Sequence, residues 1–203
     1  MSRKERKIDM NYTNKKYDFL KKPKKNRLKF NKRFWNIADE SVYLLLEKSV
    51  DLMPKRLQKL IAHYYTDARI RKLYFERLGV KMGENTFTNL GFKAIVDAGK
   101  EYSVFIGDNV SIGPNLTIVT NASAGNGVEI NSFSYVKEKL TKDMPVYIDD
   151  EAWIGANVVI LPGVRIGRCC IIGAGSVVNA DTQPYSIYAG TPAHKIRSLK
   201  EQS

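Results

Sequence analysis

The sequence has little cysteine and little histidine. Its two cysteines, Cys169 and Cys170, are adjacent, which excludes a disulfide framework and does not give the spacing of metal ligands. We therefore expect no bound metal. Only two histidines, His63 and His194, occur in 203 residues, so few side chains can act as a base near neutral pH. No apolar signal core is present near the N-terminus, and we expect a reducing, cytoplasmic compartment.

Long hydrophobic runs are also missing. The most apolar stretch, SVYLLLEKSVDLM, is short and is interrupted by Glu47 and Lys48. A helix needs about 20 mostly apolar residues in succession to cross a bilayer. This stretch therefore cannot span a membrane.

Acidic residues are scarce only in the first part of the chain. Residues 1–35 hold 14 of the 33 Lys and Arg but 3 of the 21 Asp and Glu, whereas the remaining residues are almost balanced in charge. The formal charge of +12 thus belongs to a basic arm, and we expect no nucleic acid partner. We favour a mobile, solvated arm; the alternative is weak contact with anionic lipid headgroups or a polyanionic glycan.

Three helical stretches are expected between residues 36 and 79, forming a small helical cap. The first ends before Pro54, the second begins at Pro54, and the third begins at Asp67 and is closed by Gly79. Apolar residues recur at helical spacing in all three: Ile37, Val42, Leu45, Leu46, Val50, Met53, Leu57, Leu60, Ile61, Tyr64, Tyr65, Ile70, Leu73, Tyr74 and Leu78.

The third helical stretch also carries the basic residues Arg69, Arg71 and Lys72. A basic amphipathic helix of this kind suits a membrane surface. We favour instead a helix that packs on its own protein and keeps its charges in water.

A six-residue period governs the chain after Gly79. Gly directly follows three of the six later anchors, and small or β-branched residues stand two positions before each of those six. A helix has a period of 3.6 and an open strand a period of 2, so neither produces this pattern. The anchors are Ile106, Ile112 and Ile118, and then Ile148, Ile154, Ile160, Ile166, Ile172 and Val178.

A period of six suits short strands joined by tight corners and wound so that each anchor stacks on its equivalent in the next coil. We therefore predict a hexapeptide solenoid, a parallel β-helix, with the anchors inside and Gly, Asn and Asp at the corners. Cys170 is then an interior residue and not a nucleophile. The flat faces of such a coil favour association with other copies.

The segments IGDNVSIGPNLTI, PVYIDDEAWIGANVVILPGVRIGRCCIIGAGSVV and YAGTPAHKIR resemble the hexapeptide-repeat O-acetyltransferases, among them the maltose, galactoside, nodulation-factor and polysaccharide acetyltransferases. The resemblance covers about residues 80–198 and leaves 199–203 as a tail. It implies an all-β fold, a left-handed parallel β-helix behind the N-terminal helical cap. It also implies a homotrimer, acetyl-CoA between the subunits, and transfer of the acetyl group to a sugar or polysaccharide hydroxyl.

Several residues match family positions with known roles. Asn89 and Asp97 keep the eight-residue spacing of the pair that holds the acceptor sugar, and Trp153 matches a tryptophan beside the thioester. At Asn179, Ala180 and His194 the family often has Thr, Lys, and Lys or Arg. The resemblance places acetyl-CoA against Ala156, Ala174, Gly175 and Ser176 along the pantetheine, and against Asn179, Lys195 and Arg197 towards the adenosine phosphates.

The catalytic histidine of the family is missing from its place. It normally stands in a loop that interrupts the repeat, here residues 119–145, and NLTIVTNASA aligns Ser123 with the histidine and Ala124 with the proline after it. Attack of a hydroxyl on a thioester needs a base with a pKa near neutrality, and a serine is not such a base.

An enzyme with Ser123 in this catalytic position needs another base. Asp97 is favoured because it matches the acceptor site, and its carboxylate needs a raised pKa for this role. His63 from the helical cap, and Glu129 or Asp143 from the loop, are alternatives. The competing function is a non-catalytic trimer that acts as a binding or scaffold protein. An antibiotic-modifying acetyltransferase of the same fold has the least support.

Overall fold

The computed structural model describes residues 32–96 and 102–200. Residues 1–31 of the predicted basic arm, the predicted acceptor residue Asp97 and the end of the C-terminal tail lie outside the described residues. The chain divides into two compact units, Met1–Ser41 and Val42–Ser203, and helix α2 (Lys32–Ser49) runs across their boundary. None of the helices in the described part of the chain has the length and hydropathy that a membrane span requires.

The helical region ends where the sequence predicts, but it begins earlier: α2 starts at Lys32, so residues 32–35, predicted to belong to the basic arm 1–35, are part of this helix. Three further helices follow α2: η2 (Val50–Leu52), α3 (Lys55–Tyr64) and α4 (Ala68–Glu76). Pro54 takes the N-cap position of α3, and the Asp67 carboxylate caps α4 by accepting a hydrogen bond from Arg69 N at 2.8 Å. Gly79 follows α4 with a φ of 87°, the left-handed conformation of a helix stop. These start and stop signals are confirmed.

The helical region packs on the first coil through α4. Phe75 is buried, and its ring meets the ring of Phe92 edge-on, with centroids 4.8 Å apart. On α3, by contrast, Leu60 is 55% exposed and Tyr64 is 76% exposed. Part of the apolar face predicted for α3 therefore lies outside this core.

Arg71 corrects the expectation that the third helix keeps its charges in water. Arg71 is buried, and its guanidinium donates hydrogen bonds to the carbonyl oxygens of Tyr65, at 2.7 Å, and of Thr88. The Lys72 ammonium donates to the carbonyl of Gly83. Burial lowers the pKa of Arg71, and the carbonyl oxygens compensate for the water that its charge has lost. The helix packs on its own protein, as we favoured from the sequence, but Arg71 and Lys72 take part in that packing.

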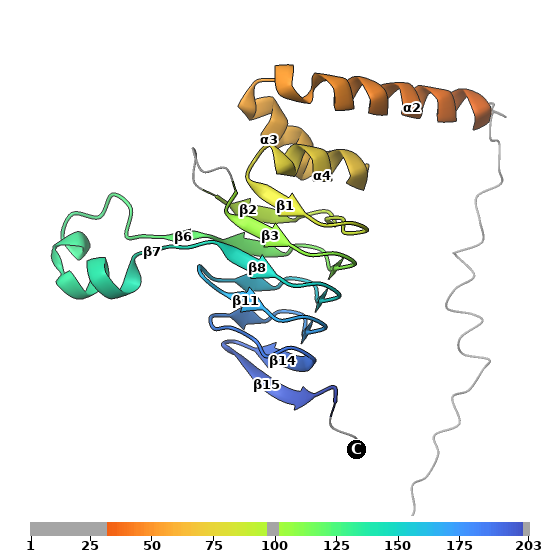
Figure 1. Cartoon of the computed structure of the whole chain (residues 1–203). Helices are drawn as coiled ribbons and strands as arrows, with labels where there is room; N and C mark the ends of the chain where they lie inside the picture. Colours follow the sequence, from red (N-terminus) through yellow and green to blue (C-terminus); the bar gives the residue numbers. More distant parts are fainter. Residues whose placement is uncertain (1–31, 97–101, 201–203) are drawn as a thin grey trace, which may run out of the picture. The chain divides into compact units, whose positions relative to one another are not determined.

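Three sheets of parallel strands follow the helical region (Figure 1). Face A contains β1 (Val80–Met82), β3 (Val104–Ile106), β8 (Val146–Ile148) and β11 (Arg165–Ile166). Face B contains β2 (Lys93–Ile95), β5 (Thr117–Val119), β10 (Val159–Ile160) and β13 (Val177–Val178). Face C contains β4 (Ser111–Ile112), β9 (Trp153–Ile154), β12 (Ile171–Ile172), β14 (Ser186–Gly190) and the antiparallel β15 (Ala193–Ser198).

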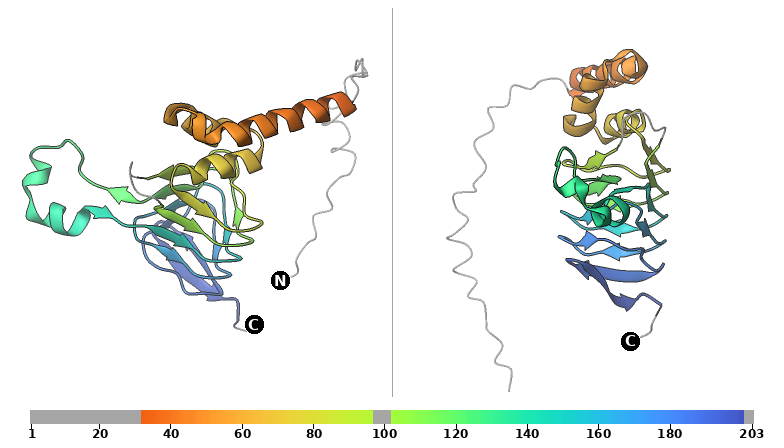
Figure 2. Two further views of the ribbon diagram at one scale, coloured as in Figure 1. Left: turned by 45° about the horizontal axis from the view of Figure 1, so that its top comes forward. Right: turned by 90° about the vertical axis from the view of Figure 1, so that its left-hand side faces the viewer.

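Consecutive strands of the repeat lie on different faces. The strands β8, β9 and β10 belong to faces A, C and B, and β11, β12 and β13 repeat this order. Trp153 pairs with Ile171 and Val159 pairs with Val177, so partners on adjacent coils are three hexapeptides apart. The chain therefore winds as a coil with three faces, and Figures 1 and 2 show its strands stacked along one axis.

The anchors of the six-residue period form the core of this coil. All nine anchors are buried, and so are the residues two positions before them, because alternate side chains along an extended segment point to the same side. Cys170 is one of these interior residues, as predicted. The second buried set is Val104, Val110, Leu116, Val146, Ala152, Val158, Val164, Cys170 and Ser176.

The corners of the coil adopt left-handed backbone conformations. Asn109, Asn115 and Asn157 have φ values of 55°, 59° and 57°, which asparagine tolerates well. Asn side chains also stack from coil to coil, since Asn115 Nδ2 donates to Asn157 Oδ1 at 3.0 Å. Glu151 and Cys169 occupy the same kind of corner with φ values of 58° and 53°. Their residue types did not predict this conformation.

The interruption of the repeat forms an arm, residues 120–145, that projects sideways from the coil in Figures 1 and 2. Its stem is an antiparallel ribbon of β6 (Asn121–Ala122) and β7 (Lys142–Asp143). Two short helical turns lie between these two strands, η3 (Ile130–Ser132) and η4 (Val136–Leu140). The arm exposes many apolar side chains for its size: Val128, Ile130, Phe133, Tyr135, Leu140 and Met144.

Candidate functional site

A row of paired positions crosses face C from Trp153 to Arg197. Trp153 on β9 pairs with Ile171 on β12, Ile171 pairs with Ile187 on β14, and Ile187 pairs with Arg197 on β15. Trp153 is 58% exposed, and Arg197 is exposed as well. Because neighbouring strands lie about 4.8 Å apart, the row is about 14 Å long. The structure thus brings the residues predicted at the two ends of acetyl-CoA onto one face.

A ledge of small residues borders this row at the corner between faces C and B. Ala156 and Ala174 take equivalent places on adjacent coils, and Gly175 N donates to the Ala156 carbonyl at 2.8 Å. A methyl group added at Gly155 would lie 2.6 Å from the backbone nitrogen of Ala174, so the coils touch here through backbone. The ledge therefore offers an extended ligand a narrow track with short side chains.

Ser176 does not belong to the surface of the ledge. It is buried, its hydroxyl donates to the Gly173 carbonyl at 2.7 Å, and it accepts a hydrogen bond from Gly190 N at 3.1 Å. Its side chain therefore fixes the inside of the corner, and only its backbone remains available for a role beside the pantetheine.

The far end of the row carries positive charge. Lys195 and Arg197 are exposed on β15, and the Lys195 ammonium donates to Gln183 Oε1 at 2.9 Å. Asn179 is exposed just beyond β13, and His194 is exposed beside Lys195. Such a group of donors suits the phosphates of a nucleotide.

Ser123 stands at the base of the arm, directly after β6. It is exposed, and its hydroxyl accepts a hydrogen bond from Gly125 N at 3.4 Å. The alternative bases Glu129 and Asp143 are exposed on the same arm. The arm, residues 120–145, contains no histidine.

A second candidate position is a hollow of about 310 Å³ between α3 and the segment before β2. We call it the His63 hollow, and it is lined by His63, Tyr64, Leu90, Gly91, Phe92 and Lys93. The predicted acceptor residue Asn89 directly precedes this lining and is exposed, and its side-chain oxygen accepts from Leu90 N at 2.9 Å. The hollow therefore lies beside one of the two residues expected to hold the sugar.

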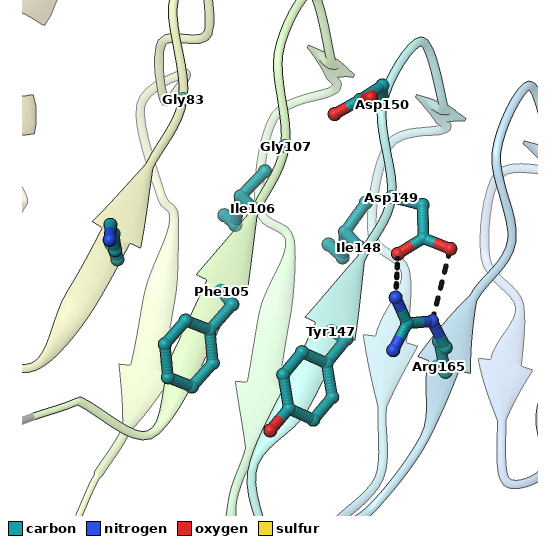
Figure 3. Close-up of a pocket in the computed structure, with 10 residues that line it drawn as sticks. Gly83, Phe105, Ile106, Gly107, Tyr147, Ile148, Asp149, Asp150 and Arg165 are labelled. Atoms are coloured by element: carbon teal, nitrogen blue, oxygen red, sulfur yellow. Dashed lines mark hydrogen bonds and ion pairs between the residues drawn. The ribbon is translucent and has the colours of Figure 1, made fainter.

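Face A carries another hollow of about 310 Å³, shown in Figure 3. Phe105 and Tyr147 stack with ring centroids 5.0 Å apart, and the Arg165 guanidinium lies 5.3 Å from the centroid of Tyr147. The Asp149 carboxylate, 2.8 Å from Arg165, accepts its hydrogen bond and raises the pKa of that guanidinium. Phe105, Tyr147 and Arg165 are register partners on adjacent strands, so we interpret the group as a cross-strand ladder that stabilises the coil.

The two cysteines are free and differ in burial, Cys169 being partly buried and Cys170 fully buried. Desolvation raises the pKa of the Cys169 thiol, and its hydrogen bond to the Glu151 carboxylate acts in the same direction. Cys170 is buried and donates to the carbonyl of Gln183. Across residues 32–96 and 102–200, no three His, Cys, Asp or Glu side chains gather as metal ligands do.

Comparison with known proteins finds the hexapeptide repeat and several acetyltransferase relatives. Residues 145–180 match the family model described as bacterial transferase hexapeptide (six repeats). The chain is 38% identical over 124 residues to a galactoside O-acetyltransferase of Escherichia coli K12, covering 61% of this chain and 56% of that protein. It is 28% identical over 180 residues to a galactoside O-acetyltransferase of Lactococcus lactis, covering 84% and 82%. The chain thus spans little more than half of the first of these relatives.

Solved structures show the same similarity. An acetyltransferase from Vibrio cholerae that contains hexapeptide repeats, solved with acetyl coenzyme A, matches with a TM-score of 0.57 at 27% identity, covering 77% of this chain and 88% of that one. A galactoside acetyltransferase solved with coenzyme A matches with a TM-score of 0.53 at 27% identity, covering 75% and 83%.

The fold and these matches show that the chain is similar to hexapeptide-repeat transferases, and the repeats that match the family model occupy residues 145–180. The resemblance of the chain to the hexapeptide-repeat O-acetyltransferases is confirmed.

Proposed function

We propose that this protein is an acetyl-CoA-dependent O-acetyltransferase that acts on a hydroxyl group of a sugar or polysaccharide, on a left-handed β-helix. The observation that carries the proposal is the row on face C, where Trp153 and Arg197 stand about 14 Å apart with the small-residue ledge beside them. Trp153 suits the thioester of acetyl-CoA, the small-residue ledge suits the pantetheine, and the basic residues near Arg197 suit the phosphates. The relatives named as galactoside O-acetyltransferases support the sugar acceptor.

Each group of residues in this site then has its own role in the transfer. Trp153 limits access of water to the thioester, Ala156, Ala174 and Gly175 border the pantetheine, and Lys195, Arg197 and Asn179 bind phosphates. Asn89 and Asp97 hold the acceptor. The acceptor hydroxyl attacks the thioester carbonyl carbon, the carbon–sulfur bond breaks, and coenzyme A leaves as the thiol.

A transfer assay tests this function. We expect purified full-length protein to release coenzyme A thiol from acetyl-CoA when a galactoside or maltose is added, and mass spectrometry to find the acetylated sugar. A protein that binds coenzyme A but transfers to no sugar of a broad panel would contradict the enzyme and favour the second candidate function, a non-catalytic binding or scaffold trimer. This second function is supported by Ser123, which is exposed and which the resemblance aligns with the catalytic histidine of the family.

A homotrimer is the expected assembly, with acetyl-CoA between neighbouring subunits. The apolar side chains exposed on the arm, such as Phe133 and Tyr135, and the flat faces of the coil favour contact with further copies. Light scattering should give three times the 23.0-kDa mass of the chain at micromolar concentration. A mass equal to one chain across this range would refute the trimer.

A further inference from the structure

We infer that His63 is the general base of the transfer and that the His63 hollow receives the acceptor sugar. The inference depends on the transferase function proposed above and supplies the residue which that function lacks. It requires the thioester at the Trp153 end of the row to reach this hollow when the protein is assembled.

A hydrogen bond to the backbone determines which ring nitrogen of His63 is basic. His63 Nδ1 lies 2.7 Å from the carbonyl oxygen of Lys59, one turn earlier in α3. A carbonyl can only accept a hydrogen bond, so Nδ1 carries the proton, and in the neutral ring Nε2 keeps the lone pair. This tautomer is the one that a base acting through Nε2 needs.

The surroundings of the ring hold it in place. Phe75 is buried and meets the imidazole edge-on, with centroids 5.1 Å apart, and the Tyr64 ring lies 6.3 Å away at a tilt. With Nδ1 bonded to the helix and one side against Phe75, the ring has few rotamers left. A base held in this way does not have to be ordered when the substrate binds.

The lining of the hollow suits a sugar better than a flat apolar ligand. Leu90 and Tyr64, which are 49% and 76% exposed, offer apolar surface to the C–H groups of a pyranose, and Lys93 and His63 offer polar atoms to its hydroxyls. Gly91 has a φ of 78°, and the chain turns there towards β2. Asn89 precedes the lining, and β2 leads on to Asp97, so the two predicted acceptor residues flank it along the chain.

The other candidates are less well placed to act as the base. His194 lies on β15, at the opposite end of the coil from α3 (Figure 1), beside the basic residues proposed for the phosphates. A carboxylate such as Asp97 has an ordinary pKa of about 3.9, far below the range that favours proton transfer at neutral pH. The Ser123 hydroxyl is not basic.

The step balances without a further reactant. The proton of the sugar hydroxyl passes to His63 Nε2 while its oxygen bonds to the thioester carbon. The carbon–sulfur bond then breaks, and the same proton is returned to the sulfur, so the products are the acetylated sugar and coenzyme A. His63 ends the cycle neutral.

Kinetics of two variants of α3 test the base. His63→Gln retains a donor for the Lys59 carbonyl but lacks a basic nitrogen, and we expect kcat to fall by about 10²–10⁴ with the Kd for coenzyme A unchanged. Arg56→Gln, a change at an exposed residue of the same helix, is the matched control and should retain wild-type kcat. A His63→Gln kcat within threefold of wild type would overturn the role of His63 while leaving the transferase function intact.

Nuclear magnetic resonance of the wild-type protein provides a readout that does not need activity. Because the chain has two histidines, the His63→Gln variant is enough to assign the resonances of both rings. The nitrogen-15 spectrum of the rings should show His63 protonated on Nδ1 in its neutral form. Titration with methyl galactoside or maltose should shift the His63 resonances and not those of His194. An Nε2-protonated neutral ring, or a His63 signal unaffected by every sugar, would overturn the inference. If instead no transfer occurs but His63 responds to sugar, the transferase function fails and the sugar site stands.

Discussion

Replacing Ile160 by alanine is expected to lower the free energy of unfolding by about 2–5 kcal/mol, the usual cost of removing a fully buried isoleucine side chain beyond its Cβ. Ile160 is completely buried on β10, and its register partners Ile118 and Val178 lie above and below it in the same core. The coil is narrow, so these neighbours cannot close over the cavity without breaking their own stacking. Denaturant unfolding at a fixed protein concentration measures the effect.

Val159→Ala is the matched control because Val159 precedes Ile160 on the same strand but is only partly buried. It pairs with Thr117 and Val177 on the outside of face B, and a change there should cost about 1 kcal/mol or less. If the two variants were destabilised equally, the inward and outward positions assigned to this strand would be wrong.

The coil could be predicted from the sequence because its physical requirement repeats. Each strand must place an apolar side chain over the inward side chain of the strand three hexapeptides earlier. The same pattern therefore recurs many times, and one irregular position does not hide it. This is why anchors as far apart as Ile106 and Val178 are all buried. Corners are less uniform, since residues other than Gly and Asn can also be held in the left-handed conformation by their neighbours. Glu151 and Cys169 do so, and their chemistry gave no signal.

The site was only partly accessible from the sequence. The resemblance predicted roles for Trp153 and Arg197, but their shared row depends on the pairing of β9, β12, β14 and β15, and one of those pairs contains a bulge after Ile187. The His63 hollow was not predicted, because it joins a helix to a turn that begins 26 residues later in the chain, Tyr64 being followed by Leu90 in the lining. No periodic pattern in the sequence links α3 to residues 90–93. The rarity of histidine had nevertheless made His63 one of the alternative bases.

Asp97→Asn is expected to lower kcat/KM for the sugar by about 10- to 100-fold. If Asp97 holds an acceptor hydroxyl, the substitution removes a hydrogen bond to a charged group, which contributes about 1.5–3 kcal/mol. The amide has the shape of the carboxylate and still accepts one hydrogen bond, so binding weakens and the chemistry continues. The loss should therefore appear mainly in KM for the sugar, with KM for acetyl-CoA unchanged. Steady-state kinetics with each substrate varied in turn separates these quantities.

The same measurement decides between the two residues that compete for the role of base. Removing a general base lowers kcat itself, by about 10²–10⁴, whereas removing a binding group acts on KM. With His63 as the base, Asp97→Asn retains most of the wild-type kcat at saturating sugar and His63→Gln does not. A collapse of kcat in Asp97→Asn, together with a nearly normal His63→Gln, would move the base to Asp97. The carboxylate would then need a pKa raised by several units to match the task, which a shifted pH profile of kcat would reveal.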